Sequence, residues 1–158
     1  GVGGHCIAVD PWFIVSQHSK ESKLIKTARE VNNFKPKWTL NKIKNLYNKI
    51  EKKDAKICIL GIAFKPNIDD LRESPALYIA NKLSKIYRDR LLVAEPNIKN
   101  LPQSLDKNNS KLVKLSYARN NSDLLVILVA HKEFKNLKKF KGLILDFTNL
   151  QEGTKKVN

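Results

Sequence analysis

Four short apolar runs, each followed by a polar segment, constrain the fold of this chain more than any other feature. They are "AKICILGIAF" at 55–64, "LLVAEP" at 91–96, "SDLLVILVA" at 122–130 and "KGLILDFTN" at 141–149. Runs of this length that are rich in β-branched residues are typical of strands buried on both faces of a sheet. A helical pattern, "SPALYIANKLSKIY", separates the first two, with Ser74 as N-cap and Pro75 at the first helical position. The alternation predicts an α/β fold with a parallel sheet.

The remaining segments give four further expectations. "NNSKLVKLSYARNN" at 108–121 fits either a short strand or a helix, and "KEFKNLKKF" at 132–140 fits a short helix. From Lys20 to about Lys53 the apolar residues recur at helical spacing, and Pro36 predicts two helices or one broken helix there. The glycine-rich start predicts a loop. We therefore expect a loop at 1–19, a helical region at 20–54 and the α/β domain at 55–158.

Composition excludes several classes of protein. The chain has 158 residues, 42% of them apolar, which is enough for a folded core. It has no run of eighteen apolar residues and no start that resembles a secretory signal, so we expect a cytoplasmic protein that does not enter a membrane. Its two cysteines form no disulfide framework and no zinc-type spacing. The formal charge of +15 comes from lysines spread along the whole length, which does not favour nucleic-acid binding.

The opening "GVGGHCIAVDPWF" contains the first candidate site. The glycines before Cys6 would let the backbone pass close to a ligand and leave the thiol exposed, and an aspartate, Asp10, follows four residues later. Such a thiol is either a nucleophile or an ordinary small hydrophobic residue, and on residue type alone the second reading is favoured. Cys58 lies in the middle of a predicted strand, where burial leaves a thiol inert.

The segment "GIAFKPNIDDLRESPA" at 61–76 contains the second candidate site. Lys65 and Arg72 bracket a turn at the carboxyl end of a strand, just before a helix N-terminus. Two cations and a helix N-terminus suit a phosphate or pyrophosphate, while pairing with Asp69, Asp70 and Glu73 is the equal alternative. Ligands of parallel sheets lie beyond the carboxyl ends of the strands.

The same rule applies to the ends of the other strands. His131 follows another predicted strand and would either face a ligand or cap the next helix.

Four motifs, in their order and spacing, resemble the UDP-glucose/GDP-mannose dehydrogenase family: "GVGGHCIAVDPWFI", "TAREVN", "GIAFKPNIDDLRESPA" and "VAEPNI". The resemblance runs from Gly1 to about Asp146 and covers only the C-terminal part of such an enzyme. It implies a Rossmann-like UDP-binding domain, a central dimerisation region and a UDP-sugar substrate. Val9 and His5, with "DPWF", point to the N-acetylhexosamine branch of the family.

The resemblance also implies a chemistry and a role for each site residue. The reaction would be an NAD-dependent, four-electron oxidation of the sugar C6 hydroxyl to a carboxylate. Cys6 would form a thiohemiacetal and then a thioester, and Asp10 would assist its hydrolysis. Gly3 and Gly4 would shape the loop around the sugar and pyrophosphate, Lys65 would reach the nucleotide sugar, and Arg72 would lie near the NAD pyrophosphate.

Because the family's NAD-binding domain is absent, we expect the isolated chain to be an inactive fragment of a homodimeric enzyme. Two alternatives remain at this point: a non-catalytic nucleotide-sugar-binding or oligomerisation module, and a basic nucleic-acid-binding protein.

Overall fold

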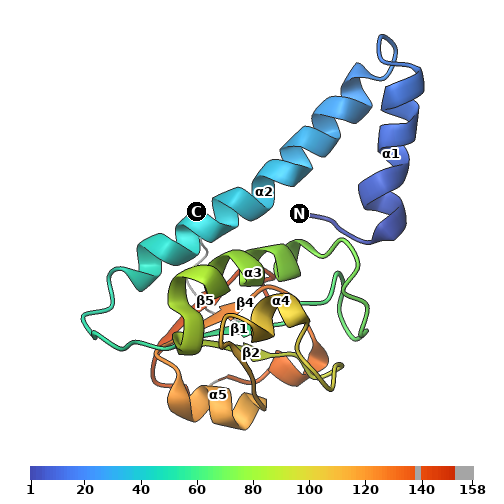
Figure 1. The fold of residues 1–158 in the computed structure, drawn as a ribbon. Coiled ribbons are helices and arrows are strands. Elements are labelled where there is room, and N and C mark those ends of the chain that lie inside the picture. Colours follow the sequence, from blue (N-terminus) through green and yellow to red (C-terminus); the bar gives the residue numbers. More distant parts are fainter. Residues whose placement is uncertain (138–139, 152–158) are drawn as a thin grey trace.

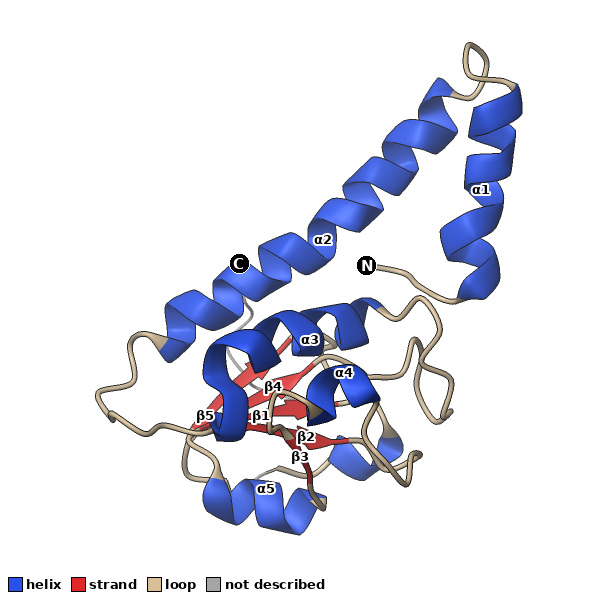
Figure 2. Ribbon diagram, viewed as in Figure 1, coloured by secondary structure: helices blue, strands red, loops and turns tan. Residues whose placement is uncertain are grey.

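A five-stranded parallel sheet forms the centre of the computed structural model, which describes residues 1–137 and 140–151 (Figures 1 and 2). Its strands are β1 (Ile57–Leu60), β2 (Leu91–Ala94), β3 (Lys111–Leu112), β4 (Leu124–Ile127) and β5 (Leu143–Asp146). Their spatial order is β3-β2-β1-β4-β5, and every pair is parallel. The predicted Rossmann-like α/β fold is therefore confirmed, with all four predicted strands in place.

Helices cover both faces of this sheet. One face carries α3 (Pro75–Tyr87) and α4 (Gln103–Asp106), and the other carries α5 (Leu115–Asn121) and the 3₁₀ turn η2 (Lys132–Phe134) (Figure 2). A second 3₁₀ turn, η1 (Arg88–Arg90), follows α3. Strand β1 is buried on both sides: Ile57 and Ile59 pack under α3, while Cys58 and Leu60 face the α5 side. This alternation is what a fully buried strand requires.

The N-terminal residues form two helices, α1 (His5–Gln17) and α2 (Lys23–Tyr47), which run beyond the sheet (Figure 1). The predicted loop at 1–19 is wrong for most of its length. The glycines that suggested it end at Gly4, and the apolar stretch that follows continues as a helix through Pro11.

Pro36 lies inside α2 and does not divide it, although the sequence predicted two helices or one broken helix. The proline lacks an N–H for the carbonyl of Asn32, four residues earlier. The chain start covers this position: Val2 N–H donates to Asn32 Oδ1 (2.7 Å), and Asn32 Nδ2 donates back to Val2 O (2.9 Å). The N-terminal segment is thereby tied to α2 at its proline.

Some of the remaining expectations are confirmed and others are not. The Ser74 N-cap is confirmed, because Leu77 N–H donates to Ser74 Oγ at 3.1 Å. The ambiguous segment 108–121 contains both a two-residue strand, β3, and a helix, α5. The helix expected at 132–140 is only the turn η2, and residues 138–139 of that stretch lie outside the described residues. Within the described parts of the chain, no helix combines the length and apolar character needed to cross a membrane.

Candidate functional site

The order of the strands places a crevice between β1 and β4. From β1 the chain moves outward to β2 and β3, and it then returns to the other side of β1 for β4 and β5. In open parallel sheets, ligands bind at such a reversal, beyond the carboxyl ends of the strands. A cavity of about 400 Å³ lies there, lined by residues after β1 (Ala63, Phe64), after β4 (Leu128, Val129), at the end of β5 (Asp146, Phe147) and on α2 (Lys35, Trp38).

The loop 61–74, between β1 and α3, borders this cavity and carries Lys65. It begins at Gly61, which has a φ of +86°; a Cβ there would lie 2.5 Å from Val129 Cβ. Only glycine therefore allows the loop to pass so close to the end of β4. Lys65 is exposed, and its Nζ lies 5.5 Å from the centroid of the Phe64 ring. Phe64 lines the cavity, so Lys65 is the next residue in the chain after a cavity-lining one and does not line the cavity itself.

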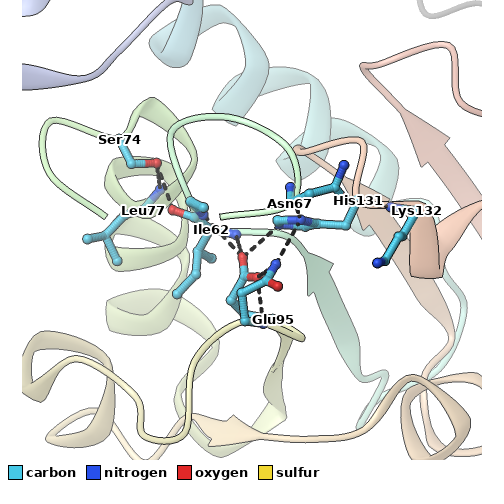
Figure 3. Close-up of polar contacts among 9 residues, drawn as sticks. Ile62, Asn67, Ser74, Leu77, Glu95, His131 and Lys132 are labelled. Atoms are coloured by element: carbon cyan, nitrogen blue, oxygen red, sulfur yellow. Dashed lines mark hydrogen bonds and ion pairs between the residues drawn. The ribbon is translucent and has the colours of Figure 1, made fainter. Parts of the chain in front are cut away.

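A buried hydrogen-bond network fixes this loop from the sheet side (Figure 3). Glu95 follows β2 and His131 follows β4, and His131 Nε2 lies 3.0 Å from Glu95 Oε2. The same Glu95 oxygen accepts N–H bonds from Ile62 (2.8 Å) and Ala63 (3.2 Å). On its other side, His131 Nδ1 accepts from Asn67 N–H at 2.9 Å. Three strand ends are thus joined through two side chains.

The hydrogen-bond donors determine the protonation states in this network. Asn67 N–H can only donate, so Nδ1 of His131 is an acceptor and the proton of the neutral ring is on Nε2, facing Glu95. Burial raises the pKa of Glu95, but hydrogen bonds from His131 and from Ile62 N–H outweigh it, so the pKa lies below its usual value. The network consequently pairs the Nε2 proton of His131 with a carboxylate whose pKa is lowered.

Cys6 and Asp10 lie on α1, one helical turn apart. Both line a shallow cleft that also includes Ile7, Pro11 and Ile14. Cys6 is exposed and lies in the first turn of the helix, after its N-cap residue Gly4, where the free N–H groups and the helix dipole favour negative charge. Cys58 is fully buried, and burial raises the pKa of its thiol well above the ordinary value, as expected for an inert cysteine.

Gly3 and Gly4 fasten the start of α1 to the loop 61–74. A Cβ on Gly3 would lie 2.2 Å from Glu73 O, and a Cβ on Gly4 would lie 3.0 Å from Cε2 of Phe64. The N-terminal segment therefore passes directly over the loop that carries Lys65, and both positions exclude a side chain. Figure 2 shows the base of α1 beside this loop.

Arg72 is held by Asp70 at the same place. Its Nη2 lies 2.6 Å from Asp70 Oδ2, and its Nε donates to the same carboxylate. Hydrogen bonds from Arg72 lower the pKa of Asp70 to about 2. The pKa of Arg72 is raised, mainly by Asp70 and to a smaller extent by Cys6 nearby. Of the two interpretations of this loop, ion pairing holds for Arg72, whereas none of the ion pairs among the described residues involves Lys65.

The sheet of this chain does not fit NAD in the manner of a dinucleotide-binding fold. There, free N–H groups of the first strand–helix loop and the following helix N-terminus hold the pyrophosphate. Here the N–H groups of Ile62 and Ala63 donate to Glu95, and the loop runs on to Ser74 instead of making a tight glycine-rich turn. Among the described residues, no group of three or more His, Cys, Asp or Glu side chains is arranged to hold a metal ion.

Sequence reasoning found the strand ends that converge but missed Glu95, which "VAEPN" displays directly after a buried run. An acidic residue at such a position is a signal that could have been used, because a charge there needs partners. His131 was expected to face a ligand or cap a helix; it is fully buried, and its side chain makes no capping bond.

The chain is similar to several known proteins. The UDP-binding-domain model of the UDP-glucose/GDP-mannose dehydrogenase family matches residues 58–152. UDP-N-acetyl-D-mannosamine dehydrogenase of Campylobacter jejuni is 58% identical over 135 residues, which are 85% of this chain and 33% of that protein. The chain thus spans about a third of the length of the curated relatives it matches.

Solved structures agree with these relationships. The UDP-N-acetyl-mannosamine dehydrogenase of Staphylococcus aureus is 31% identical, with a TM-score of 0.74 over 98% of this chain and 36% of that one. GDP-mannose dehydrogenase of Pseudomonas aeruginosa, at 23% identity, shares the fold, with a TM-score of 0.76 over 99% of this chain and 38% of that one. The family match extends from within β1 to beyond β5, and it shows that the chain belongs to the UDP-glucose/GDP-mannose dehydrogenase family.

Proposed function

We propose that this chain is the C-terminal third of an NAD-dependent UDP-N-acetyl-D-mannosamine 6-dehydrogenase. The enzyme would oxidise C6 of the sugar by four electrons to UDP-N-acetyl-D-mannosaminuronate, a precursor for polysaccharide synthesis. One observation carries the proposal: in a member of this family, Gly3 and Gly4 pack the helix that bears the exposed Cys6 onto the loop that bears Lys65.

The UDP group would occupy the crevice between β1 and β4. A cavity of about 400 Å³ is within the usual range for a small-molecule site. Lys65, whose Nζ lies 5.5 Å from the ring of the cavity-lining Phe64, would supply a cation for the diphosphate. Gly3 and Gly4 would shape the loop around the sugar and diphosphate, because they let the N-terminal segment lie close against Glu73 and Phe64. The contact of the N-terminal segment with the loop that carries Lys65 supports the proposal that Gly3, Gly4 and Lys65 take part in substrate binding.

Cys6 and Asp10 would carry the steps that this chain performs. Once C6 is an aldehyde, Cys6 Sγ adds to its carbon and the carbonyl oxygen takes a proton, which gives a thiohemiacetal. After loss of the C6 hydride and the hydroxyl proton, a thioester remains. Water then attacks the thioester carbon with Asp10 accepting its proton, the C–S bond breaks, and the uronic acid and the thiol are released.

NAD, when bound, supplies the acceptor for both hydrides, and the part of the relatives that this chain does not cover would hold it. Because Arg72 is already paired with Asp70, we propose that it only approaches the pyrophosphate of NAD from the edge of the site. Helix α1 has no buried residue, and Phe13, Leu24 and Phe34 are more than half exposed on α1 and α2. These apolar surfaces support a homodimer built on the helical region. For the whole enzyme we propose a cytoplasmic location.

Titration calorimetry tests the binding part. UDP and UDP-N-acetyl-D-mannosamine should each bind the 158-residue chain, and Lys65→Ala should weaken both by about tenfold, the value of one charge-assisted hydrogen bond. Lys111→Ala, which removes an equal charge from the edge strand β3, is the matched control and should bind as the wild type does. Absence of binding by the wild type would overturn the proposal.

A chimera tests the catalytic part. This chain would replace the corresponding third of the Campylobacter jejuni relative, and uronate formation would be followed with NAD. The chimera should turn over and its Cys6→Ser variant should not. Binding of UDP without any turnover by the chimera would instead favour a non-catalytic nucleotide-sugar-binding module.

A further inference from the structure

The buried pair Glu95–His131 takes no part in the proposed chemistry, yet it holds the loop on which that chemistry depends. We infer that the two are positioning residues, which fix loop 61–74 so that Lys65 faces the UDP crevice. The inference rests on the proposed function, because it concerns the same crevice and the same lysine.

The contacts fall on both sides of Lys65. On one side, Glu95 Oε2 accepts N–H bonds from Ile62 and Ala63. On the other, His131 Nδ1 accepts the N–H of Asn67 at 2.9 Å. The Asn67 side chain is held as well, since Lys132 N–H donates to its Oδ1 at 3.0 Å. Lys65 lies two residues from each anchor, in the middle of the span.

The backbone between the anchors has little freedom of its own to lose. Pro66 fixes one φ angle, and Asn67 has a φ of +60°, in the left-handed region. A long, exposed lysine binds a phosphate better when its backbone is already placed, because less conformational entropy is then lost on binding. The two anchors supply that placement before any ligand arrives.

Stability alone is a poor reason for this pair. Both side chains are buried, with Glu95 4% exposed and His131 0% exposed. Burying a carboxylate and its polar partner costs desolvation energy, and apolar side chains of the same volume often serve stability as well or better. What an apolar pair cannot supply is acceptors for the N–H groups of Ile62, Ala63 and Asn67. These acceptors set the path of the loop.

Glu95 also influences where a phosphate can bind. In dinucleotide-binding folds the N–H groups after the first strand face the phosphate. Glu95 takes the two N–H groups of Ile62 and Ala63, so the loop offers a phosphate its side chain, Lys65, rather than its backbone. The pair thus leaves phosphate binding to the Lys65 side chain, whereas in dinucleotide-binding folds backbone N–H groups bind the phosphate.

Two variants of His131 separate its contact with Asn67 from its contact with Glu95. In His131→Asn the side-chain oxygen lies near the former Nδ1 and can still accept from Asn67 N–H. In His131→Gln the amide nitrogen reaches the former Nε2 and can still donate to Glu95, but the acceptor for Asn67 is lost. Phe134→Leu is the control for stability. The Phe134 ring packs edge-on against the His131 ring, with centroids 5.5 Å apart, and the residue is 1% exposed. Among the hydrogen bonds of the described residues, none joins Phe134 to loop 61–74.

Calorimetry with UDP, thermal unfolding and amide hydrogen exchange of the 158-residue chain give the readouts. We expect His131→Asn to keep its UDP affinity within about threefold and His131→Gln to lose about tenfold, which corresponds to one buried hydrogen bond. The Asn67 amide should exchange faster in His131→Gln alone. Phe134→Leu should lower the melting temperature and leave the affinity unchanged.

The outcomes distinguish this inference from the proposal beneath it. Wild-type affinity in His131→Gln would overturn the inference while leaving the proposed function intact. Affinity losses that follow the melting temperature across all three variants would do the same, because they would indicate a purely structural pair. Failure of the wild type to bind UDP would overturn the proposed function, and the inference with it.

Discussion

Gly4 lies against the ring of Phe64, so closely that a Cβ on the glycine would come within 3.0 Å of ring atom Cε2. This contact joins the first turn of α1, which carries Cys6, to the loop that carries Lys65. Gly4 also has a φ of +97° with a ψ of 153°, a conformation that is almost exclusive to glycine. The relative position of the proposed nucleophile and the proposed phosphate ligand therefore depends in part on a residue without a side chain.

We predict that Gly4→Ala separates these two elements. The substitution imposes about 1–3 kcal/mol of backbone strain, which the chain can relieve by detaching the first turn of α1. Hydrogen exchange should quicken at Ala8, whose N–H donates to Gly4 O at 3.1 Å. Uronate formation by the chimera should fall about tenfold to a hundredfold, since small displacements of a reacting group have effects of that size.

The matched test is the double variant Gly4→Ala/Phe64→Leu. A smaller, flexible side chain relieves the contact but not the backbone strain, so the double variant should recover part of the activity lost by Gly4→Ala. Strictly additive effects would show that the contact with Phe64 does not position α1.

Thiol labelling should distinguish the two cysteines. Cys6 is exposed, whereas Cys58 is fully buried and has a raised pKa. Iodoacetamide at pH 8 should therefore attach one label to the native chain, at Cys6, and two labels in denaturant, as counted by mass spectrometry. Saturating UDP-sugar should slow the reaction at Cys6, because the sugar would lie beside it. Labelling of Cys58 in the native chain would contradict the buried strand.

The sheet was predictable because each buried strand is visible within its own few residues. Cys58 could be placed for the same reason, since its neighbours Ile57 and Ile59 are apolar and β-branched. The Ser74 cap was predictable because capping is also local. These features need no knowledge of what lies far away in the chain.

Features that depend on distant partners were not predictable. Glu95 and His131 are 36 residues apart, and neither segment indicates the other's partner. Helix α1 was mistaken for a loop because the glycines just before it, Gly3 and Gly4, serve contacts with Glu73 and Phe64, not local flexibility. Similarly, Pro36 leaves α2 continuous where the chain start packs against it.

Arg72 and Lys65 should have separable roles. Arg72 is committed to Asp70 by a two-pronged contact, and about two thirds of its side chain is exposed, with a relative accessibility of 65%. Arg72→Ala should leave the UDP affinity of the isolated chain within about twofold, because it lies outside the proposed diphosphate contact. In the chimera it should raise the KM for NAD by about tenfold, the effect of one charge-assisted contact.

Lys65→Ala should show the reverse pattern, with UDP affinity lost and the KM for NAD little changed. Lys111→Ala, which also removes one positive charge, is the control for both measurements. If Arg72→Ala weakened UDP binding as much as Lys65→Ala does, the assignment of the two cations to different ligands would be wrong.

The stability that Glu95 provides should depend on pH in one direction. The fold lowers the pKa of Glu95. Burial alone would raise this pKa, but the hydrogen bonds from His131 and Ile62 lower it by a larger amount. A carboxyl group with a lowered pKa stabilises the fold above the pKa of the unfolded chain, near pH 4.3, and that contribution is lost as the pH falls through the folded value. Glu95→Gln should therefore lower the free energy of unfolding by about 1.5–3 kcal/mol at pH 7, and the difference from wild type should shrink below about pH 4.3.

Urea unfolding between pH 3 and pH 8 measures this difference directly. Asp70 and Asp123 also have lowered pKa values, but they are present in both proteins, so their contributions cancel in the comparison. Glu133→Gln makes the same chemical change at an exposed position of η2 and should alter the free energy of unfolding little at any pH. A Glu95→Gln difference that stays constant from pH 7 to pH 3 would show that the carboxylate charge does not stabilise the loop, and that shape alone holds Ile62 and Ala63 in place.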